Sequence, residues 1–531
     1  MKLKPLIYVL SSLLLLAACK EKKAGSETES AGTQVRTTAK SSDYSQQHRP
    51  QFHFSPPAHW MNDPNGMVYH KGEYHLFYQH NPDSSVWGPM HWGHAVSKDL
   101  VHWENLPIGL YPDSLGTIFS GSAVLDEQNT SGLGTKDNPP LVAIFTYHFA
   151  EGEKAGRNDY QSQGLAYSLD NGRTWKKYAK NPVLPSPGIK DFRDPKVSWH
   201  EPSKQWVMAL AVVDHIEFYG SPNLTAWKKL SQFGGKGVGA HGGVWECPDL
   251  FPLTVNGQQK WVLFVSINPG GPQGGSATQY FVGHFDGKEF KNDNKPDTIL
   301  WVDQGADNYA GVTWANIPPD DGRRLFIGWM SNWQYANVVP TEAWRSALTL
   351  TRELNLVHTP AGLRLASTPV KELQKLRART EVIKAQEIAG TLNLSEAYKL
   401  KDPLLELQLN LVVSQGQDLV LRFSNEKGEH LDVGYSARNA QLFIDRSKAG
   451  KADFKPAFAA RHGAEIDLEK GQLQLHVFLD VASVEVFANG GKLVMTDVFF
   501  PSEVFTKAEI ISKGAKVLEG SSAYVLKPIW K

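Results

Sequence analysis

The sequence predicts an all-β protein, a five-bladed β-propeller followed by a C-terminal β-sandwich. From residue 52 to about 356, short β-runs are interrupted by Gly, Pro and Asn, with hardly any helical periodicity. After about residue 380, apolar and polar residues alternate as in sheets that bury one face. A chain of 531 residues is also too long for one ordinary domain.

A recurring turn motif sets the number of blades. Each copy follows a β-run and ends in an aromatic residue, and most copies begin with Ser followed two residues later by Asp or Asn. The copies lie at 97–103, 168–175 and 221–227, with a weaker copy at 284–290. Their spacing of roughly 50–70 residues suits a four-stranded blade, which predicts about five blades. A large sandwich with similar hairpins would not explain the motif.

The N-terminus predicts export and lipid attachment. Lys2 and Lys4 precede an apolar run, 6–18, that is too short to span a bilayer as a mature helix. The run ends in Leu16-Ala17-Ala18-Cys19, which resembles the bacterial lipobox. We therefore expect residues 1–19 to be a signal peptide, with Cys19 lipidated and the protein anchored to a membrane of the bacterial envelope. A plain secretory signal with a chance cysteine is the alternative.

Four further segments follow the signal peptide. Residues 20–50 are polar and almost free of large apolar side chains, so we expect a flexible tether. The propeller is expected at 51–356 and the sandwich at 381–531. Between them, 357–380 is expected to be a linker with a short helix, because Ser367-Thr368-Pro369 precedes a helix-like run.

The composition narrows the classes of partner. The 55 basic and 55 acidic residues balance, which gives no electrostatic reason to expect nucleic acid or an anionic membrane surface. The 16 Trp and 17 Tyr offer aromatic faces of the kind that stack on sugar rings. Only two cysteines are present, so lipidation of Cys19 leaves Cys247 without a disulfide partner, as a small buried hydrophobe.

Three carboxylates in the propeller region are the candidate catalytic groups. Asp63, Asp194 and Glu246 are each flanked by an aromatic residue and followed closely by proline. Asp63 lies among the turn dipeptides Asp63-Pro64 and Asn65-Gly66, which predict a tight turn. Carboxylates on innermost propeller strands converge at the axial funnel, where two of them could cleave a glycosidic bond. A nearby tryptophan would raise the pKa of the acid by desolvation.

Successive motifs resemble those of glycoside hydrolase family 32, which contains invertases, inulinases and levanases. The similarity covers nearly the whole mature chain. Its motifs are Trp60-Met61-Asn62-Asp63-Pro64-Asn65-Gly66, Trp92-Gly93-His94-Ala95, Phe119-Ser120-Gly121-Ser122, Phe192-Arg193-Asp194-Pro195, Trp245-Glu246-Cys247-Pro248, Gly274-Gly275-Ser276 and Gly328-Trp329-Met330.

The resemblance implies a retaining mechanism. Asp63 would be the nucleophile and Glu246 the acid and base, roughly 5–5.5 Å from it. Asp194 would hold fructose hydroxyls and stabilise the transition state, helped by Arg193, whose charge should keep Asp194 ionised.

The resemblance also implies a set of substrate-binding residues. The family's fructose-pocket positions correspond to Asn62, Gln79, Trp87, Phe119 and Ser120, with Trp329, or Trp333 close by, as a further wall. No metal or organic cofactor is expected, and the His residues show no ligand spacing. Asn308 and Thr351 depart from the family, which commonly has an aromatic residue and proline there. The first departure puts details of the pocket rim in doubt.

The function that these residues predict is an exo-acting fructan β-fructosidase that also cleaves sucrose. A fructosyltransferase using the same site is one alternative, and a non-catalytic fructan-binding lipoprotein is another. A sialidase-like propeller is a third, because 168–175 fits the Asp-box pattern, but no arginine triad is recognisable. Linkages of the β-2,6 and β-2,1 types both remain open, because variable loops contact the leaving group.

Overall fold

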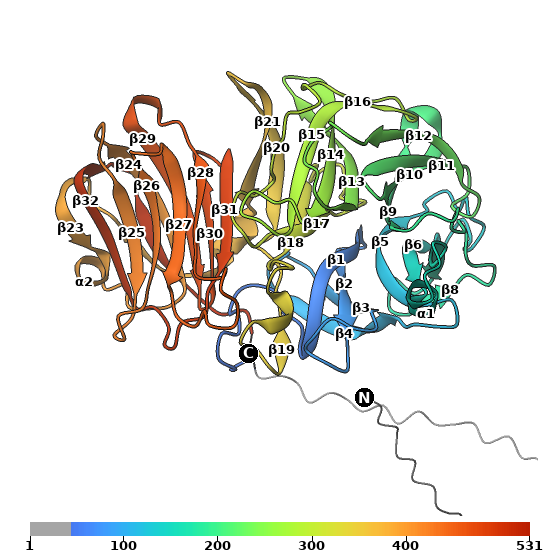
Figure 1. Ribbon diagram of the computed structural model, residues 1–531, viewed down its shortest axis with the longest axis horizontal. Coiled ribbons are helices and arrows are strands. Elements are labelled where there is room, and N and C mark those ends of the chain that lie inside the picture. The colour runs from blue at the N-terminus through green and yellow to red at the C-terminus, as the bar shows by residue number, and fades with distance from the viewer. Residues whose placement is uncertain (1–43, 531) are drawn as a thin grey trace, which may run out of the picture. The chain divides into compact units, whose positions relative to one another are not determined.

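The computed structural model describes residues 44–530 and confirms the predicted architecture (Figure 1). Five antiparallel sheets of the propeller follow one another in chain order, and the sandwich strands come after them. The predicted signal peptide with Cys19, and the predicted tether as far as residue 43, lie outside the described residues. No helix within 44–530 is long and apolar enough to cross a membrane.

Each blade is a meander that starts with its innermost strand. Blade I consists of β1 (His59–His70), β2 (Glu73–Asn81), β3 (His91–Ser97) and β4 (Trp103–Leu110), with the short β19 (Trp344–Arg345) beside β1. Blade II consists of β5 (Thr117–Leu125), β6 (Leu141–His148), β7 (Gln161–Ser168) and β8 (Lys176–Lys177). Blade III consists of β9 (Phe192–His200), β10 (Gln205–Val212), β11 (His215–Ser221) and β12 (Lys228–Gly234). Blade IV consists of β13 (Val244–Val255), β14 (Gln258–Asn268), β15 (Ala277–Phe285) and β16 (Phe290–Asn292). Blade V consists of β17 (Tyr309–Thr313), β18 (Arg324–Trp329), β20 (Arg352–Thr359) and β21 (Gly362–Pro369).

The repeated turn motif joins the third strand of a blade to the fourth. In blades I to IV the Asp or Asn side chain of the motif accepts hydrogen bonds from backbone N–H groups of the turn; these acceptors are Asp99, Asp170, Asn223 and Asp286. This local bonding closes the hairpin without a ladder partner. Blade V has the plain turn Thr359–Gly362 instead, which is why the sequence contains only four copies.

Blade V also corrects the expected domain boundary. Its two outer strands occupy 352–369, so the propeller does not stop at 356. The connection to the sandwich is reduced to Val370 and the 3-10 helix η3 (Lys371–Leu376). Apolar and polar residues alternate only weakly in β21, which is why the sequence predicts a linker there.

The sandwich has two layers around an aliphatic core. One layer contains β22 (Arg377–Val382), β33 (Ser522–Leu526), β24 (Leu405–Val413), β29 (Gln472–Asp480), β30 (Ser483–Ala488) and β31 (Leu493–Val498). The other contains β23 (Gln386–Asn393), β25 (Leu419–Ser424), β26 (His430–Ser436), β27 (Gln441–Lys448) and β28 (Arg461–Glu465). The long β32 (Lys507–Val517) belongs to both, since its first half pairs with β25 and its end with β24.

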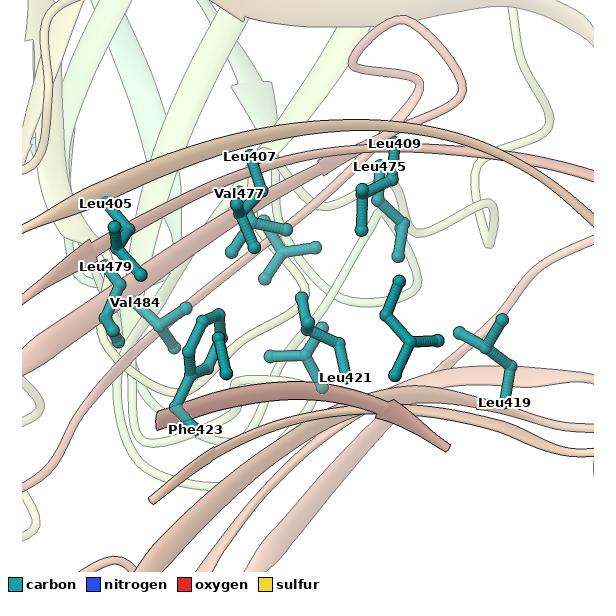
Figure 2. Close-up of a cluster of buried hydrophobic side chains, with 14 of the residues drawn as sticks. Leu405, Leu407, Leu409, Leu419, Leu421, Phe423, Leu475, Val477, Leu479 and Val484 are labelled. Carbon is teal, nitrogen blue, oxygen red and sulfur yellow. The ribbon is translucent and has the colours of Figure 1, made fainter. Parts of the chain in front are cut away.

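The alternating leucines of β24 form one wall of that core. Figure 2 shows Leu405, Leu407 and Leu409 on the side opposite Leu421 and Phe423, and all five are buried. Besides η3, the helices are single turns, and Leu394 of α2 is part of this core. They are α1 (Ala150–Lys154), α2 (Leu394–Tyr398), η1 (Glu201–Ser203), η2 (Ala336–Val338) and η4 (Glu469–Gly471).

The prediction of a tether is wrong for residues 44–50, because the chain is packed from Tyr44 onward. The Tyr44 ring stacks on Trp530 with centroids 3.9 Å apart, and Arg49 is buried. The backbone of Gln51 accepts a hydrogen bond from the N–H of Ile529. Residues 44–51 are thus part of the folded body and bind the other end of the chain.

Buried charges join the propeller to the sandwich. Arg352 of blade V donates to Glu485 of β30 at 2.5 Å and to Asp303 at 2.9 Å. His53 bonds to Glu485 at 2.9 Å and to Asp480 at 2.8 Å. We call these five residues the seam cluster. They explain why β30 is buried along its whole length although its sequence alternates.

Candidate active site

A bulge at the same position of every innermost strand builds the site. In each case three residue steps on the inner strand oppose two on its neighbour. The bulges span Met61–Pro64 of β1, Ile118–Gly121 of β5, Arg193–Lys196 of β9, Glu246–Asp249 of β13 and Tyr309–Val312 of β17. A bulge re-aims side chains that would otherwise alternate across the sheet. All three candidate carboxylates lie in these bulges.

The predicted tight turn at Asp63 is therefore wrong. Residues 59–70 form one strand, and the turn dipeptides serve two successive bulges in it. Gly66 has φ +53°, and a Cβ there would lie 2.7 Å from the rings of Phe77 and Trp92. Residues that favour turns also favour bulges, since both need unusual backbone angles.

The backbone of three other bulges, in β9, β13 and β17, is strained. Asp194 has φ +64°, Cys247 +44° and Ala310 +51°, in the left-handed region that side chains other than glycine rarely adopt. Such residues cost of order 1–3 kcal/mol each and cluster at functional sites. Here the strain turns three neighbouring strands toward one point.

Asp63 is held by short side-chain contacts. It is buried, accepts a hydrogen bond from Ser120 at 2.6 Å and another from the Asn62 amide at 2.9 Å. Asn62 is fixed in turn by the indole N–H of Trp60 at 2.7 Å. The carboxylate is thus oriented by groups from two blades before any ligand arrives.

Asp194 lies next to Asp63 through the thiol of Cys247. The Cys247 Sγ is 3.4 Å from Asp63 Oδ2 and 3.5 Å from Asp194 Oδ2, and the Cys247 N–H donates to Asp194 at 3.0 Å. Burial raises the pKa of Asp194 to about 7, with Glu246 and Asp63 adding to the rise and Arg193 opposing it. Burial and the same carboxylates also raise the pKa of the Cys247 thiol well above its usual range. Cys247 is therefore a protonated donor between two acids.

Arg193 forms only a long ion pair with Asp194, weaker than the sequence led us to expect. Its guanidinium donates to Asp191 at 2.6 Å and to Glu246 at 3.1 Å, and its nearest approach to Asp194 is 3.9 Å. The expectation that Arg193 keeps Asp194 ionised is wrong, because the cation is shared among three carboxylates in a buried site. The Tyr309 hydroxyl donates to the other oxygen of Glu246.

One cavity of about 320 Å³ brings the predicted residues together. Gln79 is buried there, and its amide nitrogen has no hydrogen-bond partner among the described residues. Trp87 lies at the rim, 43% exposed. The predicted residues that line the cavity are Asn62, Asp63, Gln79, Trp87, Phe119, Ser120, Arg193, Asp194 and Glu246.

Trp329 is the exception among the predicted residues. It is fully buried and does not line the cavity; its ring packs against Trp333, which does. The two tryptophans are four residues apart at the end of β18, and the chain turns between them. Trp333, named above as the alternative wall, takes that place.

Sequence reasoning missed several further lining residues. Tyr309 follows Asn308, one of the two departures from the family, and its hydroxyl contacts Glu246, which is distant in sequence. His148 stacks on Phe119 with centroids 4.2 Å apart and faces Glu153 on α1 at 3.2 Å. The other lining residues that were missed are Gln161, Asp191 and Asn337. No local pattern marks them, since they lie in loops or at strand ends outside the recognised motifs.

Neither of the two departures from the family lies at the pocket. Asn308 is buried and donates to Asp303 at 3.2 Å, beside the seam cluster. Thr351 is buried behind blade V and donates to the carbonyl of Leu100. Within 44–530, no group of three or more His, Cys, Asp or Glu side chains is placed to hold a metal ion.

Comparisons with known proteins agree with this geometry. Residues 53–369 match the family model "Glycosyl hydrolases family 32 N-terminal domain", and residues 372–525 match "Glycosyl hydrolases family 32 C terminal". A levanase of Bacillus subtilis (strain 168) is 50% identical over 499 residues, 93% of this chain and 72% of that protein. An extracellular exo-inulinase of Aspergillus ficuum is 39% identical over 510 residues, 89% of this chain and 93% of that protein.

Solved structures share the whole fold. The exo-inulinase from Aspergillus awamori superposes with a TM-score of 0.82 at 35% identity, covering 92% of this chain and 100% of that one. A β-fructofuranosidase from Schwanniomyces occidentalis, in complex with fructosyl-erythritol, gives 0.81 at 32% identity and covers 93% and 100% of the two chains.

Proposed function

The chain belongs to glycosyl hydrolase family 32, and we propose that it is an exo-acting fructan β-fructosidase. It releases fructose from the non-reducing ends of levan- or inulin-type fructans and also cleaves sucrose. One observation carries the proposal: Asp63, Asp194 and Glu246, from three different blades, line a single small cavity. The levanase and exo-inulinase relatives support the substrate class.

Asp63 and Glu246 divide the chemistry in two displacements. Asp63 attacks the anomeric carbon of the terminal fructosyl unit, while Glu246 protonates the departing glycosidic oxygen. Glu246 then removes a proton from water, which attacks the same carbon and releases Asp63 and fructose. The configuration is retained because each displacement inverts it.

Asp194 and Arg193 hold the sugar during both displacements. With its pKa near 7, the carboxyl of Asp194 is partly protonated at neutral pH, so it can donate to one fructose hydroxyl and accept from another. Arg193 adds positive charge beside Glu246, which it contacts directly. Both residues lie in the same bulge of β9.

The unpartnered amide of Gln79 supports a polar ligand in the cavity. A buried donor without a partner costs about 1–3 kcal/mol, which a sugar hydroxyl would remove on binding. Asn62 and Ser120 orient the nucleophile and complete the polar floor, while Phe119, Trp87 and Trp333 supply aromatic walls. A volume of about 320 Å³ is at the lower end for ligand sites, which suits one terminal sugar unit.

Product analysis tests the proposal directly. Digests of levan, inulin and sucrose, followed over time by chromatography, should show free fructose as the first product from every substrate. Early ladders of oligosaccharides would contradict the exo assignment. Growth of longer fructosides in concentrated sucrose would favour the fructosyltransferase alternative. No release from any of the three, despite binding, would favour a non-catalytic fructan-binding lipoprotein.

The proposed location is the bacterial envelope, with a lipid on Cys19. The fungal relatives are named as extracellular enzymes, which supports export. Labelling of cells with a fatty-acid analogue should mark the wild-type protein and not a Cys19→Ser variant. A labelled Cys19→Ser variant would rule out this anchor.

A further inference from the structure

A second cavity, of about 410 Å³, lies deeper along the same innermost strands. In β5, β9 and β13 its lining residues follow those of the active-site cavity in sequence: Val124 comes after Ser120, Val197 after Asp194, and Asp249 after Glu246. Strands rise about 3.3 Å per residue, so the second cavity is centred roughly 10 Å further along the axis. It opens at the other end of the propeller, and we call it the distal cavity.

The distal cavity contains an acceptor and a donor that the protein leaves unused. Asp249 is fully buried; its Oδ2 accepts from the Thr313 N–H at 2.6 Å and from Lys196 at 3.0 Å, but its Oδ1 has no partner. The guanidinium of Arg324 forms no hydrogen bond or ion pair within 44–530 and lies over the Phe251 ring at 5.2 Å. Burial lowers the pKa of both Lys196 and Arg324, because Asp249 compensates them only in part.

Aromatic faces complete the lining. Trp199 and Trp261 are half-buried on neighbouring blades, and Trp199 packs edge-on against Trp206 at 5.2 Å. Glu201, at the mouth, has a side chain that is 65% exposed, so the cavity is open to solvent. Its volume falls within the range of about 300–1,000 Å³ usual for small-molecule sites.

The charge of the lining selects among ligand classes. It contains two cations, Lys196 and Arg324, against four carboxylates, Asp126, Glu127, Glu201 and Asp249. A sugar phosphate or another anion is therefore disfavoured. A neutral polyol fits better, because each hydroxyl can accept from Arg324 and donate to Asp249, while the apolar face of a sugar ring covers an indole.

We propose that the distal cavity is a second, non-catalytic site that binds a fructofuranosyl segment of the substrate chain. The identity of the sugar rests on the proposed function, whereas the unused donor and acceptor do not. Chain held at this end of the propeller raises the local concentration of non-reducing ends near the active site. The site should matter for polymers and not for sucrose.

Titration calorimetry of the full chain tests the proposal without turnover. In a Glu246→Gln background, short inulin- and levan-derived oligosaccharides should bind at two sites. Adding Arg324→Met should weaken the second site at least about tenfold, the effect of one lost charged donor, and the independent variant Trp199→Ala should weaken it by removing an aromatic face. Arg438→Met, at an exposed arginine of the sandwich, is the matched control and should keep both sites.

Kinetics of the otherwise wild-type enzyme provide the second measurement. Arg324→Met should raise KM for polymeric fructan several-fold while leaving kcat, and all constants for sucrose, unchanged. One binding site in the parent, or a second site that survives both variants, would overturn the distal site alone. Absence of fructan binding at either site, together with absence of hydrolysis, would overturn the proposed function as well.

Discussion

The active-site cavity and the seam cluster both bury several charged groups, but the buried carboxylates are balanced by cations to different extents. At the seam, burial acts to raise the pKa of Glu485, yet Arg352 and His53 outweigh it and lower that pKa. In the pocket, one arginine serves Asp191, Asp194 and Glu246, and the pKa of Asp194 rises to about 7. The carboxylates of the structural cluster thus have nearby cations that keep them ionised, whereas those of the reactive site have too little positive charge around them.

The largest expected effect is on turnover in the pocket. Asp63→Ala removes the attacking group and should lower kcat at least about 10⁴-fold. The melting temperature should stay close to wild type, because Asp63 stabilises no buried cation. Asp159→Ala, at an exposed acid, is the control and should keep full activity. An active Asp63→Ala enzyme would contradict the mechanism.

At the seam the expected effect is on stability. Arg352→Met leaves Asp303 buried without a cation and Glu485 with His53 alone, and it should lower the free energy of unfolding by about 3–5 kcal/mol. The molecules that remain folded should keep their kcat, since Arg352 does not line the pocket. Urea titrations monitored by tryptophan fluorescence measure the first quantity. Arg157→Met, in an exposed ion pair, should show no such loss.

Asp194 should make the stability depend on pH in the acid range. Because its pKa in the folded state is near 7, the folded protein holds a proton there that the unfolded chain releases near pH 4. Stability should therefore fall as the pH rises from about 4 to 7, by up to about 4 kcal/mol. Asp194→Asn should remove this fall, although it also impairs catalysis. Identical pH profiles of the two proteins would show that Asp194 is ionised throughout.

His53 should give the seam its own pH dependence, in a higher range. Burial disfavours its charged form, but the hydrogen bonds to Asp480 and Glu485 prevail and raise its pKa to about 9. Its contribution is fully present below about pH 6.5 and is lost as the pH rises through 9, a change of about 3 kcal/mol. A His53→Gln variant should be less stable at pH 6.5 and approach wild type near pH 10. A constant difference across that range would contradict a charged His53.

The smallest effect is expected at the rim of the pocket. Trp87 is 43% exposed at the rim, so Trp87→Ala should leave the melting temperature close to wild type and raise KM for sucrose several-fold, about 1 kcal/mol. Tyr111→Ala, at another exposed aromatic residue outside the cavity, is the matched control. Equal KM values for the two variants would remove Trp87 from the binding surface.

The sequence allowed the fold class and the pocket's carboxylates to be predicted because both depend on local patterns. The turn motif is local, and so is the environment of each acid. The tight turn at Asp63 failed because turn-forming dipeptides serve bulges equally well, and only strand pairing distinguishes the two. The choice between Trp329 and Trp333 failed for a similar reason, since the path of the chain after β18 decides which ring faces the cavity.

Long-range pairing explains what could not be predicted. Arg193 was assigned to Asp194, its neighbour in sequence, yet it binds Glu246 on the next blade. Tyr309 and His148 reach the site from blades V and II. The seam cluster likewise joins residues from His53 to Glu485, and no alternation or motif links segments so far apart.

The stacking of Tyr44 on Trp530 has a consequence for synthesis. The segment 44–56 lies against blade I and the sandwich, and its backbone is bonded to Ile529 and to the side chain of Asp480. During translation, residues 44–56 are therefore synthesised long before Ile529 and Trp530, which they contact in the folded protein. The docking of segment 44–56 is therefore a late step of folding, which follows the synthesis of residue 530.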